Sequence, residues 1–239
     1  MVVRAAAVLA VLAVLGVYYG VSEHLPELPQ WGDVAFVGLA LMPLTFLLVW
    51  LALPLRETGP RELAVAAVSL VVLAVILEWA GLDIAANFVK LAAVAAAGWW
   101  FLGLFEALSW VLLVALLIIP VDSFSVARGP TKEIVENQPQ VFNALSVSFP
   151  LPGQHSSAQL GLPDILFFSL FLGAAARFGL RVGWTWLAMA LSFGTTLALA
   201  VGFDVAGLPA LPLLSAAFVL VNADLIWRAY KDGSARPSK

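Results

Sequence analysis

Long apolar runs separated by short polar breaks extend over most of this chain, and they are the first indication of its fold. A helix needs about 20 mostly apolar residues to cross a bilayer, whereas a membrane-spanning strand alternates between apolar and polar positions. The runs here are continuous, so the pattern predicts an all-α protein, a polytopic bundle of transmembrane helices. Eight segments are long enough, at residues 5–21, 34–54, 62–80, 84–102, 105–127, 162–180, 183–204 and 209–229.

Proline and glycine mark several boundaries between the runs, because proline breaks a helix from within and glycine favours turns. Gly59-Pro60 separates the second run from the third, and Pro150 and Pro152 precede the sixth. The first run follows Arg4 and lacks a small-residue cleavage site. We therefore interpret it as a membrane helix that is retained rather than as a signal peptide.

The longest interval between runs is residues 128–161. It begins with polar residues and continues into 141–149, where apolar and polar positions partly alternate. This pattern predicts a short helix followed by a strand-like piece. A loop of this length in a compact protein is usually either functional or disordered, and the sequence leaves both possibilities open.

Composition supports a membrane protein and excludes several other classes. The chain is 62% hydrophobic and 11% charged, whereas soluble domains are roughly 45–50% apolar and 25% charged. The lipid bilayer is therefore its expected solvent. A net charge of −3 without a basic tract argues against a nucleic-acid partner. The chain has no cysteine and two isolated histidines, so we expect no metal site and no cofactor.

The distribution of Lys and Arg predicts an orientation, because cytoplasmic loops carry an excess of these residues. With eight spans and a cytoplasmic N-terminus, nine of the twelve fall inside: Arg4, Arg56, Arg61, Arg177, Arg181, Arg228, Lys231, Arg236 and Lys239. Both termini are therefore predicted to be cytoplasmic. The expected organisation is four N-terminal spans in 1–104, four further spans with the long loop in 105–229, and a cytoplasmic tail in 230–239.

Charged side chains inside apolar runs need an explanation, because burying a charge in hydrocarbon is costly. The candidates are Glu78, Lys90, Glu106, Asp122, Asp164, Asp204 and Asp224. Most have a structural explanation. Asp224 is four residues before Arg228, which predicts a pair on one helix face. Lys90 is expected to reach the membrane surface or to pair with an acid such as Glu106.

Asp122 and Asp164 differ from the others, because the predicted topology places both in the outer portions of consecutive spans. Two carboxyls at one depth can face each other and share a proton, since close like charges resist double ionisation. One would then act as a base towards water, and the other as an acid towards a carbonyl oxygen. The same pair would also suit a cation site or a proton relay, so depth alone leaves these readings open.

The local sequences around these aspartates resemble those of a known family. Asp122 follows Ile119-Pro120-Val121 near the end of one run, and Asp164 ends Gly161-Leu162-Pro163-Asp164 at the start of the next. Pro209-Ala210-Leu211 opens the last run. This ordered set resembles the presenilin and signal peptide peptidase family of intramembrane aspartyl proteases, especially its microbial members. The resemblance covers residues 105–229.

The resemblance implies an aspartic endopeptidase that hydrolyses peptide bonds within transmembrane substrate helices, with Asp122 and Asp164 as the catalytic pair and no metal. The residues that it implies position the substrate are Gly161, Leu162, Pro163, Pro209, Ala210 and Leu211. An unwound substrate is expected to pair as an added strand with 141–149 and 207–212. The expected partners are transmembrane peptides or proteins and the lipid bilayer, and the sequence leaves the oligomeric state open.

The sequence departs from the family pattern at specific points. Val121 stands where the family has tyrosine, and Pro163 stands where it has the second glycine of Gly-x-Gly-Asp. The family has nine spans, whereas eight are predicted here. Two alternatives follow. The chain could be a catalytically inactive presenilin-like protein, as Pro163 suggests, or an ion- or proton-coupled transporter with helices broken at Pro163 and Pro209.

Overall fold

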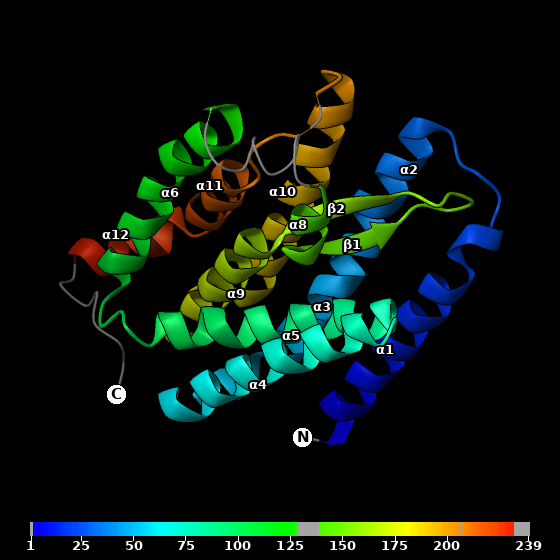
Figure 1. The fold of residues 1–239 in the computed structure, drawn as a ribbon. Helices are drawn as coiled ribbons and strands as arrows, with labels where there is room; N and C mark the ends of the chain where they lie inside the picture. The colour runs from blue at the N-terminus through cyan, green and yellow to red at the C-terminus, as the bar shows by residue number, and fades with distance from the viewer. Residues whose placement is uncertain (1, 129–138, 206, 232–239) are drawn as a thin grey trace.

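A computed structural model describes residues 2–128, 139–205 and 207–231, which are mostly helical (Figure 1). The first half consists of α1 Val2–Val21, η1 Ser22–His24, α2 Gln30–Phe36, η2 Val37–Leu41, α3 Met42–Ala52, η3 Leu53–Glu57, α4 Pro60–Trp79 and α5 Asp83–Leu102. The second half consists of α6 Leu108–Arg128, α8 Pro139–Ala144, β1 Ser146–Pro150, β2 Ser157–Gly161, α9 Leu162–Arg177, α10 Val182–Gly202, α11 Leu211–Val221 and α12 Ala223–Lys231.

Several helices are long and apolar enough to cross a membrane, which confirms the prediction of a multi-pass helical protein. Six qualify in the described part of the chain: α1, the continuous helix α2–η2–α3, α4, α5, α6 and α10. A seventh results if α11 and α12, which meet at 63°, form one bent span. The predicted count of eight is not confirmed. The difference is α9, which has 16 residues and extends about 24 Å at 1.5 Å per residue. It is therefore shorter than the helix of about 20 residues that crosses a bilayer.

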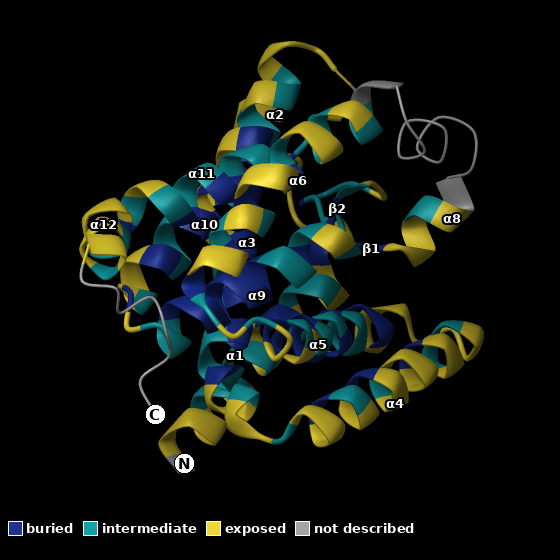
Figure 2. Cartoon of the chain, turned by 90° about the vertical axis from the view of Figure 1, so that its left-hand side faces the viewer, coloured by how far each residue is buried: buried dark blue, intermediate teal, exposed yellow. Residues whose placement is uncertain are grey.

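The short helix α9 lies at the centre of the bundle (Figure 2). It packs against α5, α10 and α11 and also contacts α6. Nine of its residues are buried, from Ile165 to Ala175. At Gly98 of α5, an added Cβ would lie 2.6 Å from the Leu166 carbonyl oxygen, so the two backbones are in direct contact there. Protein rather than lipid therefore surrounds much of α9.

The helix formed by α2, η2 and α3 packs along α10 at a second close backbone contact. An added Cβ on Gly38 would lie 2.8 Å from the Gly194 Cα atom, and one on Gly194 would lie 2.8 Å from the Gly38 carbonyl oxygen. Only glycine at both positions permits this approach. Gly38 lies in η2, a π-helical turn from Val37 to Leu41, and such turns are rare interruptions of an α-helix.

Lys90 pairs with an acid, as the sequence suggested, but neither Lys90 nor Asp224 has the partner that was predicted. Lys90 pairs with Glu78, with 2.7 Å between Nζ and Oε1, rather than with Glu106. This follows from α4 and α5 packing together, which brings the last turn of α4 beside the start of α5. Asp224 does not pair with Arg228. It accepts two hydrogen bonds from Arg181, of 2.6 and 2.7 Å, which tie α12 to the start of α10.

The interval between α6 and α9 forms a helix and a β-hairpin. The predicted strand-like piece is present only from Ser146 onward, as β1, because the first part of 141–149 belongs to the helix α8. The polar part in which the short helix was predicted lies largely outside the described residues. The antiparallel partner β2 was not predicted, and Ser146 pairs with Gly161 at the end that adjoins α9. The polar residues 129–138, like 232–239 of the predicted tail, lie outside the described residues.

Candidate active site

The three sequence motifs meet where α6, α9 and α11 pack together (Figure 1). Asp122, on α6, accepts a hydrogen bond of 3.2 Å from the backbone N–H of Leu211, at the start of α11. Asp164, on the first turn of α9, lies close enough to Asp122 for the two carboxyls to interact electrostatically. Both aspartates are partly buried. The two acids therefore interact electrostatically across the contact between α6 and α9.

The start of α9 holds the Asp164 carboxyl against the backbone. Gly161 is the N-cap residue in an extended conformation, and Asp164 is the third residue of the helix. The carboxyl folds back beside the Gly161 backbone, whose N–H interacts with it electrostatically, in the direction that a capping box uses. An added Cβ on Gly161 would lie 3.2 Å from Asp164 Oδ2. Glycine at 161 therefore leaves space for the carboxyl to fold back.

Pro163 is compatible with this arrangement. It is the second residue of α9, and it is exposed. The first backbone N–H groups of a helix have no acceptor within that helix, so proline removes no hydrogen bond at this position. Proline in place of the family's second glycine therefore does not disturb the helix that carries Asp164.

Pro209, Ala210 and Leu211 lead into α11 and present its first backbone N–H to Asp122. Ala210 is the N-cap residue, and its side chain cannot accept a hydrogen bond from the helix. The Asp122 carboxylate, which comes from another helix, takes that role. A negative charge at a helix N-terminus is also favoured by the helix dipole. The Pro-Ala-Leu segment thus orients the first aspartate by a direct contact.

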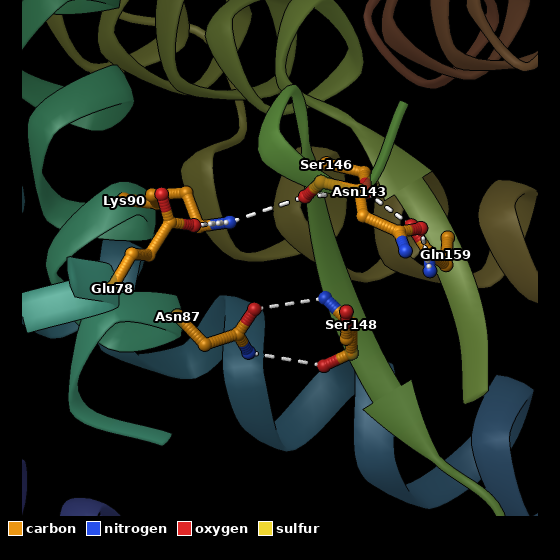
Figure 3. Close-up of polar contacts among 7 residues, drawn as sticks. All are labelled: Glu78, Asn87, Lys90, Asn143, Ser146, Ser148 and Gln159. Carbon is orange, nitrogen blue, oxygen red and sulfur yellow. Dashed lines mark hydrogen bonds and ion pairs between the residues drawn. The ribbon is translucent and has the colours of Figure 1, made fainter. Parts of the chain in front are cut away.

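The hairpin that leads to Asp164 is fixed by side chains from α5 and α1. Asn87 of α5 accepts a hydrogen bond of 2.8 Å from the Ser148 backbone N–H and donates one of 3.0 Å to its carbonyl oxygen (Figure 3). The Asn87 amide therefore pairs with β1 as a neighbouring strand would. The hydroxyls of Tyr18 and Tyr19 donate to the carbonyl oxygens of Pro150 and Ser148, each at 2.7 Å.

A second set of polar contacts connects the ends of α4 and α5 to the turn between α8 and β1. Lys90, paired with Glu78, also donates a hydrogen bond of 3.2 Å to the Asn143 carbonyl oxygen (Figure 3). The Asn143 side chain accepts one of 2.6 Å from Gln159 of β2. Gln159 in turn accepts one from the Ser146 hydroxyl. Charged and amide groups within the apolar bundle thus hold the hairpin in place.

The two outer edges of the hairpin differ in whether their backbone groups already have hydrogen-bond partners. The outward backbone groups of β1 at Ser148 and Pro150 are already bonded to Asn87 and the tyrosines. By the alternation of an antiparallel pair, Ser157 and Gln159 turn their backbone groups to the outer edge of β2. Within the described ranges, no other segment bonds to these groups. The edge of β2 is therefore available for another strand.

Sequence reasoning found both aspartates and their flanking motifs, but it missed the residues that position the hairpin. Asn87 interrupts the fourth apolar run, and Tyr18-Tyr19 lie near the end of the first. These residues could have been identified from the sequence as polar groups inside apolar runs, because each such group needs a hydrogen-bond partner in a dry environment. In the part of the chain that is described, no group of three or more His, Asp or Glu residues is arranged to hold a metal.

Comparison with known proteins adds no family to this picture. No protein-family model matches the sequence, and no curated protein matches it. The argument for function therefore depends on the residues of the site and on their geometry.

Proposed function

We propose that this protein is an intramembrane aspartyl protease in which Asp122 and Asp164 activate a water molecule. One observation carries the proposal: Asp122 on α6 interacts with Asp164 on α9 and is bonded to Leu211 on α11. Three motifs that are far apart in the sequence thus come together around one pair of carboxyls. Ionisable side chains are costly to place inside a membrane, so such a pair is expected to serve a function.

The chemistry follows from a pair that shares one proton. The ionised carboxyl takes a proton from water, and the resulting hydroxide attacks the scissile carbonyl carbon while the protonated carboxyl donates to the carbonyl oxygen. The tetrahedral intermediate then collapses and the C–N bond breaks. The leaving nitrogen takes the proton that the first carboxyl gained from water, and the second carboxyl recovers its proton from a hydroxyl of the intermediate. The products are a carboxylate and an amine, and the pair returns to its starting state.

Backbone contacts support this role for the two aspartates. Asp122 accepts a hydrogen bond from the Leu211 backbone N–H, and the Asp164 carboxyl lies beside the Gly161 backbone, whose N–H interacts with it electrostatically. These contacts orient the carboxyls, because Leu211 begins one packed helix and Gly161 directly precedes another. Each carboxyl has two oxygens, so one backbone contact leaves capacity to bind water and the substrate carbonyl.

The hairpin supports a specific way of presenting the substrate. A peptide bond in a helix must be unwound before attack, and an added β-strand holds an unwound segment extended. Pairing with 141–149, as the sequence suggested, is disfavoured because 139–144 is helical and the outer edge of β1 is occupied. The open edge of β2 is the better site. It ends at Gly161, three residues before Asp164.

The direct test is cleavage of a single-span substrate by the purified full-length protein in lipid. We expect Asp122→Asn and Asp164→Asn each to abolish cleavage while the protein remains folded. Asp204→Asn is the matched control, because Asp204 is exposed and its positive φ of 53° is equally accessible to asparagine. In H₂¹⁸O, one ¹⁸O atom should enter the new C-terminal carboxyl. Cleavage by either site variant at the native rate would refute the proposal.

The transporter alternative makes a different prediction. The bend of 63° between α11 and α12 is the feature that favours it, because carriers use broken helices at their binding sites. Proton- or cation-coupled uptake into proteoliposomes, lost in Asp122→Asn and unaffected by a hydroxyethylene transition-state analogue, would identify a carrier.

A further inference from the structure

A pocket lies at the end of the bundle opposite the hairpin. It has a volume of about 330 Å³ and is lined by η3, the start of α4, and the ends of α5 and α9. Its charged lining residues are Arg56, Arg177 and Glu57. The aspartate pair is not part of this pocket, so nothing in the proposed protease chemistry uses it.

Hydrogen-bond donors in this pocket lack acceptors. The Arg56 Nε–H and the Trp99 indole N–H are both buried and have no partner among the described residues. Trp99 is only 5% exposed. An unpaired buried donor is costly, and these two groups can only donate, so a ligand that satisfied them would have to bring acceptor atoms.

The charge of the pocket favours an anion. Arg56 pairs through Nη1 with Glu57 at 2.8 Å, but the Glu57 side chain is 71% exposed and is screened by water. Arg177 donates from Nη1 to the Leu102 carbonyl oxygen at 2.9 Å. Neither interaction uses Arg56 Nε or the Nη2 group of either arginine. Two guanidinium groups therefore keep donors for a ligand, and guanidinium forks match the oxygens of a phosphate group.

The surroundings of the pocket indicate a lipid rather than a soluble anion. Helix α4, which forms one wall, turns most of its apolar side chains outward, and only Leu63, Ala67 and Ala74 are buried (Figure 2). The indole of Trp100 is 40% exposed beside it, as is typical of tryptophans at membrane interfaces. A ligand that places acyl chains along α4 and a phosphate between the arginines fits both features.

We propose that the Arg56–Arg177 pocket binds the headgroup of an anionic phospholipid. The predicted orientation places the pocket at the cytoplasmic surface, where basic pockets between helices recognise anionic lipids. The headgroup phosphate accepts from Arg56 and Arg177 and satisfies donors that are otherwise unpaired. The acyl chains lie against the outward face of α4. This inference depends on the membrane architecture and not on the proposed protease activity.

The test uses the purified full-length protein in neutral detergent, with intrinsic tryptophan fluorescence, to which Trp99 and Trp100 of the pocket contribute, as the signal. Three probes are titrated: dihexanoyl phosphatidylglycerol, dihexanoyl phosphatidylcholine and inorganic phosphate. We expect saturable binding of the phosphatidylglycerol and little response to the other two. Arg56→Gln and Arg177→Gln should each weaken that binding about tenfold, because each removes a charge-assisted contact.

Controls separate a direct contact from general charge or misfolding. Arg61→Gln and Arg228→Gln remove exposed arginines outside the pocket, and we expect less than about a twofold change. Arg177→Lys keeps the positive charge but lacks the guanidinium fork, so it should bind phosphatidylglycerol better than Arg177→Gln does. Far-UV circular dichroism checks that each variant folds. Equal binding of phosphatidylglycerol by the wild type and the Arg56→Gln/Arg177→Gln double variant would overturn the proposal. Saturation by inorganic phosphate alone would replace the lipid with a soluble anion.

Discussion

Replacing Asn87 by alanine should loosen the hairpin that leads to Asp164. The Asn87 side chain is 6% exposed and makes two hydrogen bonds to Ser148 of β1, of 2.8 and 3.0 Å. Alanine removes both. The Ser148 carbonyl oxygen keeps its bond from the Tyr19 hydroxyl, whereas the Ser148 N–H is left without a partner among the described residues.

The expected loss of stability follows from these two groups. The lost bond to the carbonyl oxygen contributes about 1 kcal/mol, and leaving the N–H unsatisfied costs about 1–3 kcal/mol. Asn87→Ala should therefore lower the free energy of unfolding by about 2–4 kcal/mol. Asn143→Ala is the matched control, because Asn143 is exposed and its side chain makes one bond to Gln159. We expect it to cost less than about 1 kcal/mol.

The assay is reversible unfolding in mixed micelles, followed by circular dichroism, with cleavage of a single-span substrate measured separately. Because β1 and β2 are paired and β2 ends at Gly161, we also expect slower cleavage by Asn87→Ala at temperatures where it is folded. Equal unfolding free energies for Asn87→Ala and Asn143→Ala would show that the buried amide does not hold the strand.

Three further predictions concern helix contacts and the aspartate pair. Gly38→Ala should lower the unfolding free energy by about 1–3 kcal/mol, because its Cβ would lie 2.8 Å from Gly194 Cα, whereas Gly16→Ala, with open space around it, should not destabilise the protein. Gly161→Ala should reduce cleavage at least tenfold with little loss of helicity, because its Cβ would crowd the carboxyl of the second aspartate. Gly207→Ala meets no atom within 4 Å and serves as its control in the same cleavage assay. The rate of cleavage should depend on pH as a bell, since one carboxyl must be protonated and the other ionised, and a rate that rises through a single step would contradict a shared proton.

Part of the site was predictable because its residues stand in local motifs. Asp164 and Gly161 are three residues apart, so any helix that begins at 162 brings the carboxyl back to the Gly161 backbone. The contact between Asp122 and Leu211 joins residues 89 positions apart. The family resemblance assigned both to one set of motifs, but the hydrogen bond between them depends on how α6 and α11 pack.

Pairing partners were less predictable than the polar residues that need them. The sequence identified Lys90 as a charge that required an explanation, yet the partner that it suggested, Glu106, is wrong. Glu78 is the partner because the turn between α4 and α5 places it beside Lys90. Asp224 likewise has a partner other than the predicted one. It pairs with Arg181 rather than with Arg228, because the bend after α11 brings Asp224 to the start of α10.

The sequence by itself determined where the chain is helical, since every predicted apolar segment contains a helix in the structure. It did so because the thickness of a bilayer requires long runs of apolar residues, and such runs are visible without knowledge of their neighbours. The tertiary structure alone decided that α9 is enclosed by other helices, that β2 pairs with β1, and that Asn87 substitutes for a strand. Those features arise from contacts between distant segments, and a hydrogen bond or a close backbone approach exists only once both partners are in place.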